Sequence, residues 1–266
     1  MREPVLRAVI FDYGNTLIGM DPSTPSARTD YADVVARPGA ERLAAHLAAT
    51  GTLNGRAGRF IDRFLEIRER NRLTAEQTGQ EITAEASLAE ALSDENGASL
   101  PPAAIRGAVA VYFSAEEERI VALPGALGTL ESLRVAGVKV GLLSNATDGR
   151  YVERVAVRLG MRPYFDLFVV SADIGVRKPR AEAFRSFLDR WSVPAPSIAM
   201  VGDSLYHDVD GANRLGLYSI HFTLISNPGD PPHAGKIVPK ASVGSHPALR
   251  EALEPLLNGD LDSQPA

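Results

Sequence analysis

The chain has 266 residues, of which 45% are hydrophobic and 23% are charged, which is the balance of an ordinary globular protein. This length allows one large domain or a domain with a sizeable insertion. The formal net charge of -5 argues against a general nucleic-acid binder, and the absence of cysteine excludes disulfides and thiolate chemistry. No stretch approaches the length of a membrane span, and the first apolar run is too short for a signal peptide and contains Asp12. We therefore expect a cytoplasmic protein without nucleic-acid or membrane partners.

The first apolar run covers residues 5–11, is interrupted only by Arg7 and ends at Asp12. Gly14 and Asn15 follow and are typical of a tight turn. The pattern predicts a strand buried on both faces, as in a parallel sheet. Taken alone, Asp12 has an ordinary explanation as a turn or capping residue after a strand.

The next section of the chain has helical patterns only. Residues 19–25 are rich in Gly, Pro, Ser and Asp, which predicts a linker. Up to residue 114, apolar residues then recur at helical spacing in four segments without a strand pattern, which predicts a small helical bundle. The four segments are 38–50, 60–67, 82–92 and 101–113.

From residue 121 onward, strand and helix patterns alternate. The expected strands are 138–143, 167–170, 198–201 and a final one at 218–222, and the expected helices are 127–133, 152–159, 181–191 and 205–215. Such a βαβ series implies a parallel sheet with helices on both faces. A Pro- and Gly-rich surface loop over 227–247 should precede a closing helix at 248–257.

The opening strand can find partners only in this second half of the chain. The helical bundle is therefore expected to be an insertion. The predicted fold is a doubly wound α/β sheet formed by residues 1–20 and 119–266, with a helical domain formed by residues 21–118.

Polar residues stand at the ends of these strands or in the loops after them. They are Asp12, Ser144 with Asn145, Lys178 and Asp203. Ligands of open parallel sheets bind outside the carboxyl ends of the strands, where the strand order reverses. Acidic groups and one cation at such an edge predict a site for a metal ion and an anionic substrate.

These motifs resemble the four ordered motifs of the haloacid dehalogenase superfamily. The residues that carry the resemblance are Asp12-Tyr13-Gly14-Asn15-Thr16-Leu17, Ser144-Asn145, Arg177-Lys178-Pro179 and Gly202-Asp203-Ser204 with Asp208. The segment from Asp208 to Gly216 is also similar to the helix of the fourth motif. The resemblance covers the whole chain and implies a Rossmann-like core with a helical cap inserted between the first and second motifs.

The resemblance implies a role for each motif residue. Asp12 would be the nucleophile that forms an aspartyl-phosphate. Mg²⁺ would be held by Asp12, the carbonyl of Gly14 and Asp203, and Asp208 would orient a metal-bound water or ligate the ion more distantly. Ser144 and Asn145 would donate hydrogen bonds to the phosphoryl oxygens. Lys178 would neutralise Asp12 and the phosphate. The implied activity is that of a phosphatase acting on a small phosphorylated metabolite.

One position departs from the usual pattern of such phosphatases. They carry a second Asp two residues after the nucleophile, where this chain has Gly14, and that Asp protonates the leaving oxygen and activates water. General acid-base help is typically worth about 10²–10⁴-fold in rate. We expect either a substrate with a good leaving group, such as an acyl phosphate, an anomeric sugar phosphate or an anhydride, or a proton supplied by Asp21 or by a residue of the cap.

Two other functions stay open. A dehalogenase would use Asp12 to attack carbon without a metal, and Gly202-Asp203-Ser204 favours the phosphatase over it. A non-catalytic relative would account for Gly14, but Asp12, Lys178 and Asp203 together argue against that explanation. A mutase would depend on the missing second Asp and ranks below the phosphatase and the dehalogenase. The sequence indicates neither the substrate nor the oligomeric state.

The second helical segment of the insertion carries a group of arginines, which are Arg63, Arg68, Arg70 and Arg72. They could bind an anionic substrate. Glu66 and Glu69 are interleaved with them, which favours a solvated, mutually paired face instead.

Overall fold

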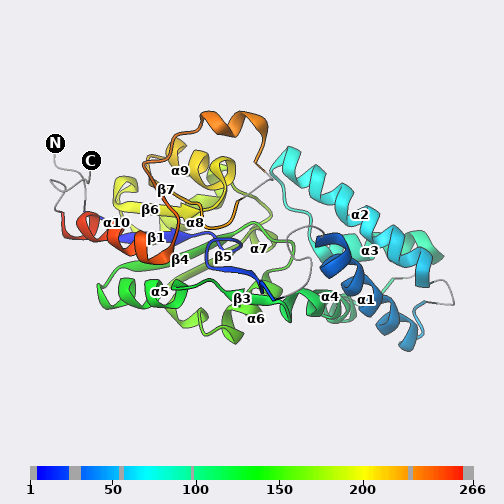
Figure 1. The fold of residues 1–266 in the computed structure, drawn as a ribbon. Coiled ribbons are helices and arrows are strands. Elements are labelled where there is room, and N and C mark those ends of the chain that lie inside the picture. Colours follow the sequence, from blue (N-terminus) through cyan, green and yellow to red (C-terminus); the bar gives the residue numbers. More distant parts are fainter. Residues whose placement is uncertain (1–4, 24–30, 54–56, 97–98, 227–229, 260–266) are drawn as a thin grey trace. The chain divides into compact units, whose positions relative to one another are not determined.

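The computed structural model describes residues 5–23, 31–53, 57–96, 99–226 and 230–259 (Figure 1). These residues form two compact units, which we call the α/β unit and the helical unit. The α/β unit comprises residues 1–19, 122–146 and 156–266, and the helical unit comprises residues 20–121 and 147–155. Residues 147–155, which the sequence assigned to the core, therefore cluster with the helices. Within the described residues, no helix has both the length and the apolar character needed to span a membrane.

The α/β unit is built on a six-stranded parallel sheet, as predicted, with strand order β5-β4-β1-β6-β7-β8. Its strands are β1 (Ala8–Phe11), β4 (Lys139–Ser144), β5 (Leu167–Val170), β6 (Ile198–Gly202), β7 (Tyr218–Phe222) and β8 (Ala241–Val243). The first strand is central and pairs with β4 on one side and β6 on the other. The chain runs outward from β1 in both directions, so the strand order reverses there, and this reversal is where ligands of open α/β sheets bind.

Helices alternate with the strands of this sheet along the chain. They are α5 (Ala126–Val135), α6 (Gly149–Arg158), α7 (Ser171–Ile174), α8 (Ala181–Trp191), α9 (Gly211–Arg214) and α10 (His246–Asn258), of which α6 begins in the helical unit. On one face, Phe184 and Phe187 of α8 pack with Ile10 of the central strand. Strand side chains alternate between faces, so Val9 and Phe11 point to the other face, and all four residues of β1 are fully buried. The central strand therefore has no solvated face, as its unbroken apolar sequence predicted.

The helical unit contains the four predicted helices, preceded by a short π-helical segment η1 (Ala32–Ala36). The helices are α1 (Arg37–Ala49), α2 (Ala57–Thr78), α3 (Ala84–Asn96) and α4 (Pro102–Glu117). Helix α1 packs on α4 so closely that a Cβ at Gly39 would lie 2.5 Å from the carbonyl oxygen of Tyr112. Phe64 of α2 meets Tyr112 edge to face, with ring centroids 5.2 Å apart. Apolar faces of α1, α2 and α4 thus share one core.

Three short strands of the structure were not predicted from the sequence. The predicted linker over residues 19–25 begins inside β2 (Ile18–Met20), which pairs with β3 (Ile120–Ala122), and residues 24 and 25 lie outside the described part of the chain. The predicted loop over 227–247 contains β8, so β7 is not the last strand. Each of these strands has three residues, too few to show a pattern, and depends on pairing with a partner distant in sequence. The helix expected at 205–215 consists of a π-helical segment η4 (Leu205–Asp210) followed by α9.

Candidate active site

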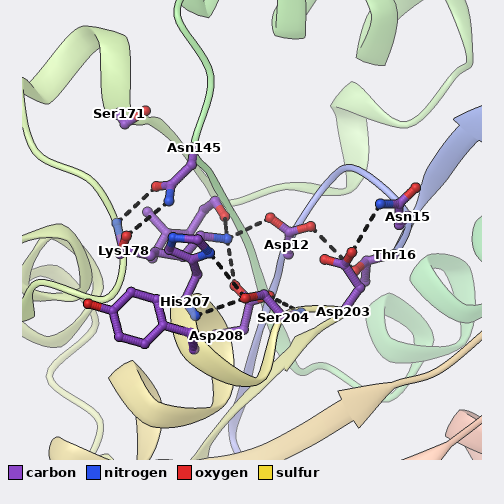
Figure 2. Close-up of polar contacts among 12 residues, drawn as sticks. Asp12, Asn15, Thr16, Asn145, Ser171, Lys178, Asp203, Ser204, His207 and Asp208 are labelled. Atoms are coloured by element: carbon purple, nitrogen blue, oxygen red, sulfur yellow. Dashed lines mark hydrogen bonds and ion pairs between the residues drawn. The ribbon is translucent and has the colours of Figure 1, made fainter. Parts of the chain in front are cut away.

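The candidate site lies at the carboxyl ends of the three central strands of the α/β unit. Asp12 directly follows β1, Ser144 ends the neighbouring β4, and Asp203 directly follows β6 on the other side. Because these strands are parallel and adjacent, their ends meet at one edge of the sheet. Figure 2 shows the side chains of Asp12, Lys178 and Asp203 in one cluster at this edge.

Lys178 is the cation of the cluster, and it is buried with a relative exposure of only 2%. Its Nζ donates hydrogen bonds to Asp12 Oδ1 at 2.6 Å and to the carbonyl oxygen of Leu143 at 2.7 Å. A third contact, at 2.7 Å to Asp208 Oδ1, is within ion-pair distance but lacks hydrogen-bond geometry. Burial alone would lower the pKa of Lys178, but Asp12 and Asp208 outweigh burial and raise it. Lys178 is therefore held as a buried ammonium between two carboxylates.

Asn145 fixes the backbone of the loop that carries Lys178. Its Oδ1 accepts a hydrogen bond from the Lys178 backbone N–H at 2.9 Å, and its Nδ2 donates one to the Lys178 carbonyl oxygen at 3.0 Å (Figure 2). From its motif, Asn145 is expected to donate a hydrogen bond to a phosphate. In this structure its amide oxygen and one amide hydrogen are engaged with the loop, so Asn145 positions Lys178. Donation to a phosphoryl oxygen by its other amide hydrogen stays a prediction. The donation expected from Ser144, which is buried at the end of β4, stays a prediction.

Asp208 is placed by a close approach to Gly202. A Cβ added at Gly202 would lie only 2.1 Å from Asp208 Oδ2, so no side chain fits at this position. The same Oδ2 accepts a hydrogen bond from the backbone N–H of Ser204 at 3.0 Å. Asp208 is thereby fixed, with 1% relative exposure, beside Lys178.

Asp203 and Asp12 each have a partner in the loop after β1. Asn15 donates from Nδ2 to Asp203 Oδ2 at 3.0 Å, and Thr16 Oγ1 lies 3.4 Å from Asp12 Oδ2 (Figure 2). Asn15 has a φ of 55°, in the left-handed region that Asn tolerates better than most residues. Neither Asn15 nor Thr16 was predicted to contact these carboxylates, although both stand inside the first motif.

Gly14, the position where a second Asp was expected, is exposed. A Cβ built there would meet no atom within 4 Å. The backbone at Gly14 has no positive φ, so a side chain could be accommodated. Packing and backbone conformation therefore do not require a glycine at position 14.

The site contains more carboxylates than cationic side chains. Ligand atoms of Asp12, Asp203 and Asp208 all lie within 4.8 Å of one another, and Lys178 forms ion pairs with Asp12 and Asp208. Burial raises the pKa of Asp12 to about 6, although Lys178 opposes the rise. Burial, together with the charges of Asp12 and Asp208, raises the pKa of Asp203 to about 8.

Converging carboxylate oxygens are the ligands that a hard divalent cation prefers, and such an ion would relieve the repulsion between them. The residues present therefore fit the Mg²⁺ site that the sequence predicted. Coordination itself stays a prediction.

Asp230 is a further residue that the sequence did not reveal. Its carboxylate accepts hydrogen bonds from the backbone N–H groups of Leu205 at 2.7 Å and Tyr206 at 3.2 Å, and from the hydroxyl of Ser204. Ser204 Oγ in turn accepts from the backbone N–H of His207 at 2.9 Å. Asp230 and Ser204 thus cap the start of η4, the segment that carries Asp208.

Curated proteins with similar sequences include phosphatases. A ribulose-1,5-bisphosphate 5-phosphatase of Halopiger xanaduensis is 36% identical over 111 residues, which are 42% of this chain and 46% of that protein. A glyceraldehyde 3-phosphate phosphatase of Methanopyrus kandleri is 32% identical over 124 residues, which are 47% of this chain and 53% of that protein. The chain thus spans about half the length of the curated relatives it matches.

Solved structures share the fold over nearly the whole chain. A 2-haloacid dehalogenase from Pseudomonas syringae aligns with a TM-score of 0.63 at 24% identity, covering 94% of this chain and 98% of that one. A phosphatase from Thermococcus onnurineus aligns with a TM-score of 0.58 at 21% identity, covering 93% and 98%. Such identities show the fold alone. The haloacid dehalogenase-like hydrolase family model matches residues 6–216, and this chain belongs to that family.

Proposed function

We propose that this hydrolase is a Mg²⁺-dependent phosphatase that acts on a small phosphorylated metabolite through an aspartyl-phosphate at Asp12. The observation that carries the proposal is the buried group of three carboxylates, of which two are in ion-pair contact with one lysine. A phosphate dianion brought to Asp12 would be repelled by this group. A reaction at that position therefore requires additional positive charge, which Mg²⁺ supplies when bound by neutralising the phosphate and polarising the phosphorus–oxygen bonds.

The proposed ligands of the ion are Asp12, Asp203 and the carbonyl oxygen of Gly14, with Asp208 orienting a bound water. Asp208 is already held by Lys178 and by the Ser204 backbone, which suits a positioning role. Asp203 is partnered by Asn15 through a single oxygen, so its other oxygen is open to a further ligand.

The reaction has two displacement steps. First, a carboxylate oxygen of Asp12 forms a bond to phosphorus while the bond from phosphorus to the leaving oxygen breaks, and the leaving group takes the electron pair. Second, a water oxygen attacks phosphorus, the bond between Asp12 and phosphorus breaks, and phosphate is released. Lys178 reduces the charge that Asp12 presents to the incoming dianion, and Ser144 would donate to the phosphoryl oxygens.

The lack of an evident donor for the leaving-group proton limits the classes of substrate that the site can hydrolyse. Gly14 offers no proton. Asp21, the alternative named from the sequence, accepts hydrogen bonds from the Ser23 backbone N–H at 2.8 Å and from its hydroxyl at 2.7 Å, and these lower the pKa of Asp21. A carboxyl held ionised is a poor acid catalyst. We therefore favour substrates whose leaving group needs little protonation, with acyl phosphates, anomeric sugar phosphates and anhydrides as the candidates.

The helical unit is proposed to be the cap, formed essentially by residues 21–118, that selects the substrate. Curated relatives named as phosphatases of ribulose-1,5-bisphosphate and of glyceraldehyde 3-phosphate support a small phosphorylated metabolite as the substrate. Both of those substrates are alkyl phosphates, so these relatives do not support the narrower class with good leaving groups. A dehalogenase attacks carbon without a metal, so it would not need a group of three carboxylates that can bind a metal ion. The group therefore favours the phosphatase over the dehalogenase.

The test is hydrolysis of p-nitrophenyl phosphate, which has a good leaving group, with and without Mg²⁺. We expect turnover that EDTA abolishes, that added Mg²⁺ restores, and that Asp12→Asn eliminates. Halide release from 2-chloropropionate in the presence of EDTA would instead establish the dehalogenase. A protein that catalyses neither reaction would support the non-catalytic reading.

A further inference from the structure

His246 is a titratable side chain that is fully buried in the α/β unit, and the proposed reaction does not use it. It is the first residue of α10 and directly follows the N-cap Ser245. Its ring packs on Phe222 of β7, with ring centroids 4.8 Å apart. Nε2 lies 2.9 Å from the carbonyl oxygen of Thr16, which belongs to the loop after β1. His246 therefore joins α10 to the loop that follows the proposed nucleophile.

This hydrogen bond fixes the tautomer of the ring. A carbonyl oxygen can only accept, so Nε2 of His246 carries the hydrogen and donates it to Thr16. Burial lowers the pKa of His246 to about 4; the Thr16 carbonyl opposes this change, and the charge of Arg250 adds to it. The neutral ring then has a bare Nδ1, which is buried with no hydrogen-bond partner in the described part of the chain. A buried polar atom without a partner costs stability, so packing alone does not explain a histidine here.

Thr16 needs this donor because it is fully buried and its carbonyl oxygen cannot turn to water. Its side chain acts on Asp12, since Oγ1 donates to Asp12 Oδ2 at 3.4 Å while Lys178 holds Oδ1 (Figure 2). The preceding residue, Asn15, has a left-handed φ of 55° and donates to Asp203. Residues other than glycine keep such a conformation only where their surroundings hold them in it. An anchor at Thr16 therefore helps to set two of the carboxylates.

We propose that His246 is a positioning residue of the active site, which fixes the loop after β1 by donating to the Thr16 carbonyl. Through this loop it orients Asp12 and Asp203 for binding Mg²⁺ and for attack on phosphorus. The inference rests on the proposed function, since it assigns a supporting residue to that reaction. Residues that hold metal ligands from behind typically contribute about 10- to 100-fold to metal affinity or activity.

The test compares variants with the wild-type protein. His246→Met fills the space with an adaptable side chain that has no donor, whereas His246→Gln places an amide N–H near the position of Nε2. Thr129→Val is the matched control, because Thr129 Oγ1 lies 3.5 Å from the carbonyl oxygen of His246 and its loss leaves the imidazole in place. Calorimetry gives the dissociation constant of Mg²⁺, and hydrolysis of p-nitrophenyl phosphate gives kcat and KM. Thermal unfolding records any loss of stability separately.

We expect His246→Met to weaken Mg²⁺ binding and to lower kcat at saturating Mg²⁺, each by about 10- to 100-fold, with KM within about threefold. His246→Gln should recover most of both losses, because it restores the donor. Thr129→Val should lower the Tm but leave Mg²⁺ affinity and kcat within about twofold, since the hydrogen bond to Thr16 is intact. Wild-type values in His246→Met, equal losses in His246→Gln, or losses of the same size in Thr129→Val would overturn the inference.

A measurement on the wild-type protein decides the case in which neither His246 variant folds. Long-range ¹H–¹⁵N spectra distinguish a protonated ring nitrogen from a bare one, and a nuclear Overhauser contact with Phe222 identifies the ring of His246. We expect the hydrogen on Nε2, and we expect the ring signals to shift when Mg²⁺ is added, because the loop that His246 holds orients the proposed ligands. A hydrogen on Nδ1, or ring signals that do not respond to Mg²⁺, would overturn the inference.

Failure of the inference can be told apart from failure of the proposed function. If p-nitrophenyl phosphate is hydrolysed with Mg²⁺ and His246→Met retains full Mg²⁺ affinity and kcat, the phosphatase stands and the positioning role falls. If the wild type neither binds Mg²⁺ nor hydrolyses the ester, the proposed function falls and the inference falls with it.

Discussion

The molecule contains two kinds of acid–base contact, and they differ in what they can do. On the helical unit, the pair Arg72–Glu69 is exposed, with relative side-chain exposures of 54% and 57%. At the end of the sheet, Lys178 contacts Asp12 and Asp208 with 1% of its side chain exposed. Exposed ion pairs are screened by water and contribute little to stability. A buried charge without a partner is costly, so it needs an opposite charge beside it. The buried group carries more acid than base, and this excess makes it a candidate for binding a cation and a phosphate.

The largest effect is expected from Lys178→Met. Two buried carboxylates would lose their cation, which we expect to reduce kcat/KM by at least about 10³-fold and to destabilise the fold by about 3–5 kcal/mol. Phosphatase assays and urea unfolding measure the two quantities. Retention of full activity would show that the buried pairs are no more important than the exposed ones.

Gly202→Ala tests the geometry of the buried group without removing a charge. The new methyl group would overlap Asp208, which lies 2.1 Å from the Cβ position, and would push it away from Lys178. We expect a loss of activity of about 10²-fold or more. The matched control is Gly107→Ala in α4, where a Cβ meets nothing within 4 Å and activity should be unchanged. Similar behaviour of the two variants would contradict the assigned position of Asp208.

Gly14→Asp adds an acid where the site has open space. If the missing proton donor limits the reaction, this variant should raise the rate on simple alkyl phosphates by about 10- to 100-fold, within the usual range for general acid catalysis. Gly14→Asn, of similar size but without a proton to give, should not. Unchanged or lower rates with Gly14→Asp would count against the inference that the natural substrate has a good leaving group.

The pH dependence of stability distinguishes the buried carboxylates from the exposed pairs. The pKa of Asp12 rises from 3.8 to about 6 on folding and that of Asp203 from 3.8 to about 8, so the folded state binds these protons more tightly than the unfolded state. Without metal, this contribution to stability is therefore lost as the pH rises from about 4 to about 8.

Mg²⁺ should reverse that loss, because it replaces the protons and binds only the folded site. We expect Mg²⁺ to raise the Tm more at pH 8 than at pH 5 in thermal melts against EDTA. Asp203→Asn should reduce the difference between the two pH values. A Mg²⁺ effect that is equal at both would show that the carboxylates do not titrate as described.

The smallest effect is expected from the exposed pair. Arg72→Met should leave kcat/KM within about twofold and shift the Tm by no more than about 2 °C, since exposed pairs are worth little. A large loss of activity would mean that the arginine-rich face of α2 takes part in the function.

The fold could be predicted because its main elements carry strong local patterns. The strand at 167–170, the helix at 181–191 and the strand at 218–222 have the predicted bounds. The central strand was recognisable because burial on both faces requires an unbroken apolar run. The short strands β2, β3 and β8 were missed because they are defined by pairing across the fold and not by their own composition.

The site could be predicted less completely. Motif order placed Asp12, Lys178, Asp203 and Asp208 in one group, and the structure brings them together. The partnership of Asn145 with the Lys178 backbone depends on how a loop 33 residues away folds back. Such contacts have no local signal in one sequence.

The central claim is that Asp12 becomes transiently phosphorylated, and rapid acid quench during turnover of p-nitrophenyl phosphate with Mg²⁺ tests it most directly. Because Gly14 supplies no base to activate water, the second step should be slow and the intermediate should accumulate. Mass spectrometry should then find one phosphoryl group, labile to hydroxylamine, on the peptide that contains Asp12. Steady release of phosphate with no such adduct at any quench time would contradict the account.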